Sequence, residues 1–534
     1  MKVELGGGFG HADGVNGGDK KDGIPVARLD DGGRALEDCT IVIFGASGDL
    51  TARKLIPALY HLYAEGQMPG RFRVIGFARR DKGDDDWRAE MRAGVEAHSR
   101  PPALDAGKWD EFANNLFYHR GDMTSAEAYA ALGERLREGE EGVGRNFVFY
   151  LAVSPSLFGT AVDQLHEVGL LRRLEEEAED WQRVVVEKPF GTDLASAREL
   201  NSHLLRHARE RQIFRIDHYL GKETVQNIMM FRFSNAIFER LWHRETVEHV
   251  QITVSEDIGV GGRGGYFEEA GTLRDMVQNH LLQILSLVAM EPPVSLEAEA
   301  IRSEKVKALQ SIRPLTPTDV ATQVVRGQYF AGNVNGENRM GYRQEERVAA
   351  ESSVETYVAL KLFIDNWRWS GVPFYLRTGK NLPMRASEVR VQFRPTPSVL
   401  FAAGGNGSVQ PNALTLRLQP DEGINLRFNG KVPGNSMETR PVRMRFGYDA
   451  EFGAYTPEAY ERLLLEAMAG DATLFIRRDE VETAWQIVDD IRVGWGDAPL
   501  SNREIYAAGT WGPEAAEELL ARSGHRWHNP QPVH

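Results

Sequence analysis

A strand, a glycine turn and a helix follow one another near the start of the chain, and this order constrains the fold more than any other feature. Residues 39–44 form a short apolar run typical of a buried parallel strand. Gly45, Ala46, Ser47 and Gly48 follow, and a helical pattern of apolar residues then extends to Tyr63. Such a turn lets backbone N–H groups approach a pyrophosphate at a helix N-terminus. The segment therefore predicts a dinucleotide-binding unit.

The glycine spacing alone leaves a plainer interpretation open. The chain has G-x-x-G at residues 45–48, whereas the full dinucleotide fingerprint is G-x-G-x-x-G, and an ordinary strand-to-helix turn also needs glycine. Pro57 lies within the helical pattern, so we expect it to kink the helix.

The second strand expected, residues 72–78, ends at Arg79 and Arg80. Enzymes that use NAD usually place an acidic residue here for the ribose 2′-hydroxyl, whereas arginine suits the 2′-phosphate of NADP. The pair predicts NADP as the cofactor. Asp81 follows directly, so some use of NAD stays open.

Three more apolar runs predict strands of the same sheet, at residues 146–153, 183–187 and 213–217. Helical patterns lie between them, which favours a doubly wound parallel sheet of Rossmann type. Ligands bind such sheets at the carboxyl ends of the strands. Lys188 follows one of these ends and Asp217-His218 another, so we expect them at one edge of the sheet.

The second half of the chain changes pattern and predicts an α+β domain with a large, mainly antiparallel sheet. Apolar and polar residues alternate within 250–254, 357–364, 388–393, 414–418 and 424–428, which is typical of half-exposed antiparallel strands. Residues 401–412 indicate a loop. We expect a disordered extension over 1–36, the Rossmann domain over 37–217, the α+β domain over 218–520 and a tail over 521–534. The large sheet is a candidate oligomer interface.

Composition excludes several classes of protein. The 534 residues carry a net charge of −14, which argues against nucleic-acid binding. No stretch has the roughly 18 apolar residues of a membrane span. Cys39 is the single cysteine, so an intramolecular disulfide and a cysteine-rich metal site are excluded, and the sequence alone leads us to expect no metal ligands. These features fit a cytoplasmic protein.

Residues 215–223, Arg-Ile-Asp-His-Tyr-Leu-Gly-Lys-Glu, place acidic, imidazole, phenol and ammonium groups within one turn after a strand. Such a set suits an anionic substrate that bears hydroxyl groups. A charged turn after a strand is also common without any function. Asp275 and His280 lie on a predicted helix, where a spacing of five residues puts them about 140° apart on an ideal α-helix, although the two could still reach one ligand. A histidine on a largely apolar helix is also commonly a core residue.

Five motifs in order closely resemble the glucose-6-phosphate dehydrogenase family. They are residues 45–50 (Gly-Ala-Ser-Gly-Asp-Leu), 187–191 (Glu-Lys-Pro-Phe-Gly), the stretch 215–223, 263–267 (Arg-Gly-Gly-Tyr-Phe) and 274–280 (Arg-Asp-Met-Val-Gln-Asn-His). The resemblance extends from about residue 40 to about residue 490. It implies oxidation of glucose 6-phosphate at C1 to the 6-phosphogluconolactone with NADP, the entry step of the pentose phosphate pathway, by a homodimer or homotetramer.

The resemblance also implies a role for each matching residue. His280 matches the general base and Asp217 the carboxylate that orients it. Residues matching the family's substrate contacts are Lys188, His218, Tyr219, Lys222, Glu256, Asp275, Lys380 and Arg385. Residues matching its cofactor contacts are Gly45, Ser47, Gly48, Asp49, Leu50, Arg79 and again Lys188.

The sequence departs from the family pattern at one expected site, and two other functions stay open. Ala386 stands where some members have a lysine for a second, structural NADP, although Arg390 and Arg417 remain, so we expect that site to be absent. A related dehydrogenase acting on an unphosphorylated sugar is one alternative. A non-catalytic NADP-binding regulator is another, and it predicts loss of His280 or Asp217.

Overall fold

The computed structural model describes residues 36–532, except for 101–102, 139–142, 175–177, 398–408, 436–437, 454–456 and 497. Nearly all of the expected N-terminal extension, and residues 401–408 of the expected loop, thus lie outside the described residues. Residues 409–412 have no regular secondary structure. No described helix is both long enough and apolar enough to cross a membrane.

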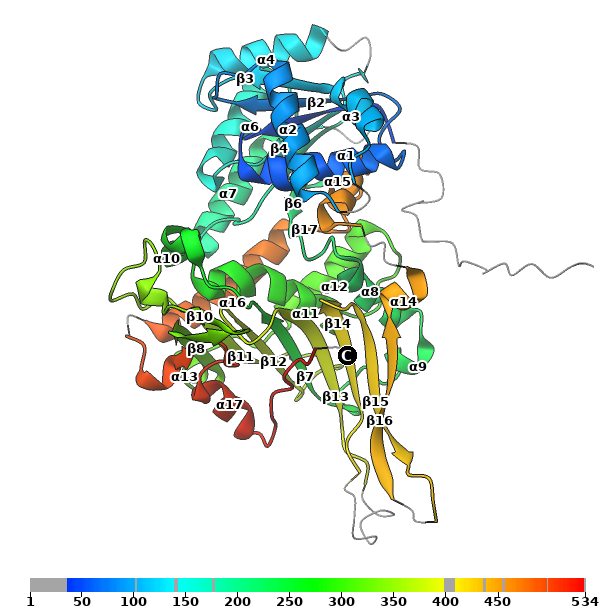
Figure 1. Cartoon of the computed structure of the whole chain (residues 1–534), viewed down its shortest axis with the longest axis vertical. Helices are drawn as coiled ribbons and strands as arrows, with labels where there is room; N and C mark the ends of the chain where they lie inside the picture. The colour runs from blue at the N-terminus through cyan, green and yellow to red at the C-terminus, as the bar shows by residue number, and fades with distance from the viewer. Residues whose placement is uncertain are drawn as a thin grey trace, which may run out of the picture.

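The N-terminal part of the chain folds around a seven-stranded sheet in the order β17-β6-β5-β4-β1-β2-β3 (Figure 1). The strands are β1 (Cys39–Phe44), β2 (Phe72–Ala78), β3 (Leu116–Arg120), β4 (Phe147–Leu151), β5 (Gln182–Val186), β6 (Ile213–Ile216) and β17 (Phe475–Ile476). All neighbours are parallel except β17, which pairs antiparallel with β6. The prediction of a doubly wound parallel sheet is confirmed.

The helices of this part form two packed groups, as expected for a sheet covered on both faces. One group is α1 (Ile56–Ala64), α2 (Asp84–His98) and α3 (Ala106–Ala113), and the other is α4 (Ala126–Glu138), α6 (Phe158–Glu167) and α7 (Leu194–His207). A π-helical turn, Thr51–Leu55, runs directly into α1. Pro57 is the second residue of α1, so the irregularity expected inside the helix lies at its start, where proline has no N–H for the helical ladder.

A nine-stranded sheet forms the second part, in the order β16-β15-β14-β13-β7-β12-β11-β8-β18. The strands are β7 (Val247–Ser255), β8 (Val324–Phe330), β11 (Tyr357–Phe363), β12 (Pro373–Gly379), β13 (Ala386–Phe393), β14 (Ala413–Gln419), β15 (Gly423–Lys431), β16 (Thr439–Gly447) and β18 (Ile505–Ala507), with a small hairpin of β9 (Gly332–Val334) and β10 (Glu337–Arg339). Only β7 with β12 and β8 with β18 are parallel, so the sheet is mainly antiparallel, as predicted.

Most of the remaining helices accompany this sheet, whereas α15 (Ala459–Ala469) packs on α1 of the N-terminal part and α16 (Arg478–Trp495) also contacts α7. The others are α8 (Glu223–Phe233), α9 (Ala236–Glu239), α10 (Gly264–Thr272), the π-helix η5 (Leu273–Leu281), α11 (Leu282–Ala289), α12 (Ala298–Gln310), α13 (Pro317–Gln323), α14 (Tyr448–Phe452) and α17 (Glu514–Ala521). Helix α8 packs on β14 and η5 packs on β12. The site residues carried by η5 are therefore held between the sheet and the N-terminal part.

The central strands of this sheet are buried on both faces, so the expectation of half-exposed strands is wrong for them. Polar residues on the second face are covered by the end of the chain. Gln251 donates a hydrogen bond to the carbonyl of Arg526, and Arg377 donates one to the carbonyl of His528. Trp527 is only 8% exposed. Residues 526–528 of the segment expected as a C-terminal tail are thus packed against the sheet.

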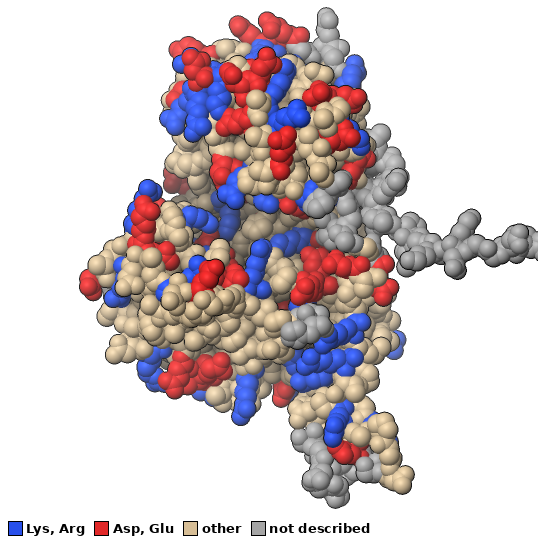
Figure 2. Space-filling view, viewed as in Figure 1, with Lys and Arg blue, Asp and Glu red and all other residues tan. Residues whose placement is uncertain are grey.

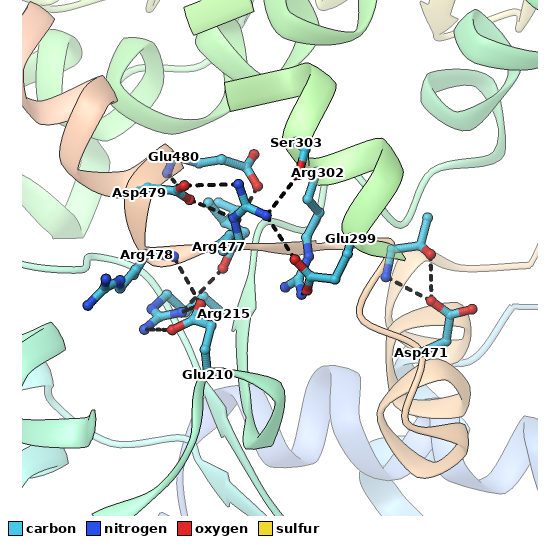
Figure 3. Close-up of polar contacts among 12 residues, drawn as sticks. Glu210, Arg215, Glu299, Arg302, Ser303, Asp471, Arg477, Arg478, Asp479 and Glu480 are labelled. Carbon is cyan, nitrogen blue, oxygen red and sulfur yellow. Dashed lines mark hydrogen bonds and ion pairs between the residues drawn. The ribbon is translucent and has the colours of Figure 1, made fainter. Parts of the chain in front are cut away.

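Charged side chains join the two parts of the molecule beside β6 (Figure 3). Arg215, which is 1% exposed, donates to Glu210 at 2.6 Å and to the carbonyl of Ile476 in β17. Arg477 donates to Glu299 of α12 at 2.8 Å. Because Asp217 directly follows β6, these contacts fix the backbone that presents its carboxylate. The division at residue 217 stays a prediction, and β17 crosses it.

Candidate active site

His280 and Asp217 form a buried hydrogen-bonded pair. The Nδ1 atom of His280 lies 2.5 Å from Oδ1 of Asp217, and both residues are 1% exposed. The backbone N–H of Tyr219 donates to the same carboxylate oxygen at 2.9 Å. The turn after β6 thus fixes the carboxylate, which in turn fixes the imidazole ring.

Lys188 approaches the opposite side of the imidazole. Its Nζ atom lies 3.0 Å from Nε2 of His280, 2.9 Å from the carbonyl oxygen of Asp275 and 3.3 Å from Asp275 Oδ1. An ammonium group can only donate hydrogen bonds, so Nε2 must accept. The hydrogen of the neutral imidazole is therefore on Nδ1, facing Asp217, and the lone pair is on Nε2.

The π-helix brings Asp275 and His280 to the same side of η5 (Leu273–Leu281). An α-helix would separate two residues five positions apart by about 140°. In a π-helix residue i bonds to residue i+5, so residues five apart lie one above the other. The separation of about 140° expected for an ideal α-helix is wrong for this reason, whereas the expectation that the two could reach one ligand agrees with their shared contact to the Lys188 ammonium.

Burial and neighbouring charges set the protonation of this group. Burial lowers the pKa of His280, Lys188 lowers it further, and Asp217 opposes both effects. Burial would raise the pKa of Asp217, but the His280 and His218 rings and the Tyr219 N–H outweigh it and leave that pKa below its usual range. The pKa of Asp275 falls to about 2, since Lys188 and Lys380 outweigh the effect of burial. Near neutral pH the site holds two carboxylates and a neutral imidazole.

The turn after Asp217 supplies a second cluster with a phenol and cations. The ring of Tyr219 stacks on His280 with centroids 4.4 Å apart, and the His218 ring lies 4.7 Å from His280. The Nζ atom of Lys222 lies 4.0 Å above the Tyr219 ring. Burial and Arg385 lower the pKa of Lys222 to about 8. Burial raises the pKa of Tyr219 to about 12, so its hydroxyl keeps its proton.

Gln419, at the end of β14, links the members of this cluster and is absent from the set expected from the sequence. Its carbonyl oxygen accepts from Lys222 and, at 3.5 Å, from Arg385, while its amide donates to Ser387 at 2.9 Å and to the Tyr219 hydroxyl at 3.3 Å. The sequence does give one indication of this role, because Gln419 is a polar residue at the end of a largely apolar strand.

The strand ends of the large sheet add the other substrate residues expected from the sequence. Lys380, after β12, donates to Glu256, after β7, at 2.7 Å. Because β7 and β12 are parallel neighbours, both side chains leave the sheet at one end. The Tyr266 hydroxyl donates to Asp275 at 3.4 Å, which connects this group to η5. Tyr266 lies within the motif at residues 263–267 and is absent from the set of site residues expected from the sequence.

Glu187 is a buried acidic residue that is also absent from the set of site residues expected from the sequence. The hydroxyls of Tyr150 in β4 and Tyr460 in α15 donate to its carboxylate at 2.5 and 3.2 Å. Burial raises the pKa of Glu187, although both hydrogen bonds oppose the rise. The contacts fix the residue that precedes Lys188.

The glycine turn after β1 packs tightly against the backbone that follows β4. Gly45 has φ +88°, and a Cβ atom there would lie 2.2 Å from the carbonyl oxygen of Ala152. Gly48 donates to the carbonyl of Gly45 at 2.8 Å, with Ser47 inside the turn and Asp49 and Leu50 opening the helix. Arg79 is exposed beyond the end of β2, while Asp81 is paired with Arg120 at 3.1 Å. This arrangement keeps Arg79 accessible and engages the nearby acid elsewhere.

Cations gather where the two parts of the molecule meet, although the chain as a whole is acidic. Figure 2 shows acidic and basic side chains interspersed over both parts, with Lys and Arg side chains along the junction between them. The contacts above place Lys188, Lys222 and Lys380 in this group. The site can therefore attract an anionic substrate despite the net charge of −14.

Family models match almost the whole chain in two consecutive segments. Residues 42–227 match "Glucose-6-phosphate dehydrogenase, NAD binding domain", and residues 229–528 match "Glucose-6-phosphate dehydrogenase, C-terminal domain". A glucose-6-phosphate 1-dehydrogenase of Chlamydia pneumoniae is 45% identical over 498 residues, which cover 92% of this chain and 96% of that protein. A glucose-6-phosphate 1-dehydrogenase 2 of Mycobacterium tuberculosis is 46% identical over 93% of this chain and 96% of its own length.

Solved structures agree with these matches. A glucose-6-phosphate dehydrogenase in complex with glucose 6-phosphate superposes with a TM-score of 0.83 at 37% identity, covering 92% of this chain and 99% of that one. The glucose-6-phosphate 1-dehydrogenase of Mycobacterium avium gives a TM-score of 0.80 at 35% identity, over 93% and 100%. Sequence and fold lead to one conclusion: the chain belongs to the glucose-6-phosphate dehydrogenase family.

Proposed function

We propose that this protein oxidises D-glucose 6-phosphate at C1 to 6-phospho-D-glucono-1,5-lactone with NADP, the first step of the pentose phosphate pathway, and that His280 is the general base. The observation that carries the proposal is the buried Asp217–His280 pair, with the accepting Nε2 atom turned toward the lysine between the expected cofactor and sugar positions. A neutral imidazole with its lone pair on Nε2 is suited to take a proton from a sugar hydroxyl.

The reaction removes a hydride from C1 and a proton from the C1 hydroxyl. The nicotinamide of NADP, when bound, accepts the hydride. Nε2 of His280 accepts the proton, and Asp217 stabilises the resulting imidazolium through Nδ1. Lys188 donates to Nε2 in the structure, so the substrate hydroxyl must replace that hydrogen bond before proton transfer can occur.

The glycine turn follows a buried parallel strand and leads directly into a helix, which is the arrangement that binds the pyrophosphate of a dinucleotide. We assign Gly45, Ser47, Gly48, Asp49 and Leu50 to the turn that holds the dinucleotide. Arg79 is the residue to contact the 2′-phosphate, since a guanidinium recognises phosphate oxygens in a bidentate manner.

The cluster after Asp217 binds the sugar phosphate in this proposal. His218, Tyr219 and Lys222 offer hydrogen-bond donors within one turn, and Arg385 lies across Gln419 from Lys222. Glu256, Asp275 and Lys380 are left to hold the sugar hydroxyls. Phosphate binding remote from C1 supplies free energy that positions the reacting carbon.

The two alternatives are disfavoured by specific residues. An enzyme for an unphosphorylated sugar has no use for cations gathered beside Tyr219, yet Lys222 and Arg385 both converge on Gln419 there. A non-catalytic regulator has no need for a buried, correctly oriented Asp217–His280 pair.

The proposal extends to the oligomeric state of the protein and to its cellular compartment. Strand β16 ends the large sheet with exposed apolar side chains, Val442 at 39% and Met444 at 61%. We assign the interface of a homodimer, or of a homotetramer built from it, to this sheet. The lone buried thiol of Cys39 and the acidic composition support a cytoplasmic location.

The test is an absorbance assay at the reduced-nicotinamide band with the full-length protein. Four combinations are compared: glucose 6-phosphate or glucose, each with NADP or NAD. The proposal requires glucose 6-phosphate with NADP to give the highest kcat/KM. A higher kcat/KM for glucose would support the unphosphorylated-sugar alternative, and no turnover with any combination would support the regulator.

A further inference from the structure

A second cluster of ionisable side chains lies between α6 and α7, which pack against each other on the N-terminal part (Figure 1). Asp163 and His166 come from α6, and His203 and His207 come from α7. None of them belongs to a motif of the proposed reaction. They are three and four residues apart on their helices, so each pair shares one helical face, and the two faces meet.

The three central ligand atoms converge closely. Nε2 of His203 and Nε2 of His207 each lie 2.8 Å from the same oxygen, Oδ1 of Asp163. The side chains are 28%, 20% and 39% exposed, so an ion from solvent can reach atoms that are already partly desolvated. Gly159, one turn before Asp163, leaves room for the His203 ring, since a Cβ there would lie 3.0 Å from its Cε1 atom.

The distances between the two Nε2 atoms and Oδ1 of Asp163 fit a small divalent ion, which would replace the hydrogen bonds between them. Zinc bonds of 2.0–2.1 Å in a tetrahedral site put ligand atoms about 3.3 Å apart. The two nitrogen-to-oxygen separations of 2.8 Å therefore have to open by only about half an ångström, and all three ligand atoms lie within 4.8 Å of one another. Two imidazoles and a carboxylate are ligands that Zn²⁺ prefers, and they leave a fourth position for water.

His166 extends the same face. Its ring centroid lies 4.3 Å from that of His207, and its Nδ1 atom is 3.1 Å from the carbonyl oxygen of Leu171. The carbonyl can only accept, so Nδ1 carries the hydrogen of this bond, and in the neutral ring the lone pair is on Nε2. This is the tautomer of a histidine ready to bind metal, with its other nitrogen held by a backbone carbonyl.

We propose that Asp163, His203 and His207 form a Zn²⁺ site that joins α6 to α7. The ion has a stabilising role here and takes no part in the proposed reaction, because the ligands lie on the helices and not at the carboxyl ends of the strands. It ties together the helix that follows β4 and the helix that connects β5 to β6. Binding to the folded state alone must raise the melting temperature in proportion to the logarithm of free zinc.

Two other clusters among the described residues also have metal-binding side chains, so zinc bound there has to be distinguished from zinc bound between α6 and α7. One contains Asp217, His218 and His280, the proposed active site. The other contains Glu248, His249 and His525, where the carboxylate oxygens lie 3.9 Å from ring nitrogens. A test therefore needs variants of each cluster and not only a count of bound zinc.

The experiment titrates Zn²⁺ into the full-length protein against a chromophoric chelator. We expect wild type to hold one ion that His203→Ala and His207→Ala each weaken by more than the roughly ten- to hundredfold typical of losing an outer partner. Asp163→Asn, which keeps the shape of the side chain, should weaken it less. His98→Ala, at an exposed histidine on α2, and His525→Gln should bind zinc as wild type does.

Two further readouts distinguish a metal site from a structural role of the histidines. Co²⁺ should give the visible absorption of a tetrahedral ion in wild type and lose it in His207→Ala. Zinc should raise the melting temperature of wild type but not of His207→Ala, while turnover of the zinc-free proteins stays equal. The proposal is overturned if the tight site survives in His203→Ala and His207→Ala, or if its occupancy disappears in His525→Gln or tracks inhibition of turnover.

Discussion

The side chains of Lys188 and His280 are in hydrogen-bond contact, with Nζ of the lysine 3.0 Å from Nε2 of the imidazole. The same ammonium group reaches Asp275 through its carbonyl and carboxylate oxygens. Lys188 thus covers the lone pair on which proton transfer depends and helps to keep His280 neutral. The positive charge has to leave Nε2 when a substrate hydroxyl arrives, but it remains close enough to bind the sugar oxygen.

The pH profile of kcat/KM should report the pKa of His280. A base must be neutral, so activity is present above this pKa and is lost as the pH falls through it. Burial and Lys188 lower the pKa of His280, which places the acid limb below the ordinary histidine value. Lys188→Gln keeps an N–H donor but removes the charge, so its acid limb should move to higher pH. An acid limb that stays in place or moves to lower pH would show that Lys188 does not act on this pKa.

His280→Asn separates a catalytic histidine from a core histidine. We expect the variant to bind both ligands and melt near the wild-type temperature, while kcat falls by roughly 10²–10⁴. The control is His61→Asn at another buried histidine, in α1, which should leave turnover per folded molecule unchanged. Near-normal turnover in a folded His280→Asn preparation would remove His280 from the mechanism.

Asp217→Asn should lower kcat in the same direction, because an amide cannot stabilise the imidazolium at Nδ1. The double variant with His280→Asn should be little slower than His280→Asn alone, since the pair acts as a unit. Single-turnover rates of the four proteins measure this. Additive losses would mean that Asp217 acts on something other than His280.

Arg79→Ala should raise the KM for NADP by about ten- to a hundredfold, the usual worth of a charged hydrogen bond, and change the KM for NAD little. The physical reason is the 2′-phosphate, which only NADP carries. Arg206→Ala, at an exposed arginine on α7, matches the change in charge and should affect neither. Equal kinetics of the wild type with the two cofactors would contradict the assignment.

Lys222→Ala should raise the KM for glucose 6-phosphate by a similar factor and leave NADP affinity unchanged. Glucose provides an internal control because it lacks the phosphate, so its kcat/KM should be insensitive to the substitution. If NADP affinity fell equally, Lys222 would belong to the cofactor site or to the fold.

Local patterns predicted the strands that are continuous and apolar, and they missed those whose partners are distant. Residues 39–44 and 72–78 became β1 and β2 with the expected bounds. Strand β17 has two residues and owes its existence to β6, far away in sequence. The polar residues of β7 and β13 were expected in solvent. Alternation shows which residues of a strand share a face, but it cannot show that the end of the chain covers that face.

In the candidate site too, local contacts could be predicted from the sequence and long-range contacts could not. Asp217, His218 and Lys222 are close in sequence, and one turn brings them together. His280 and Asp275 were expected about 140° apart because the local sequence does not reveal the π-winding of η5. Gln419 joins the site through the long-range pairing of β13 with β14, which no short motif records.

The return of β17 to the first sheet has a consequence for synthesis on the ribosome. About 260 residues separate β6 from β17, and at translation rates of about 5–20 residues per second their synthesis takes roughly 15–50 s. During that interval the nascent N-terminal part presents β6 as an unpaired edge strand, which invites association with other chains. Chaperones that shield strand edges should therefore be needed most while residues 217–475 are still being made, and slower translation should lower the yield of active enzyme.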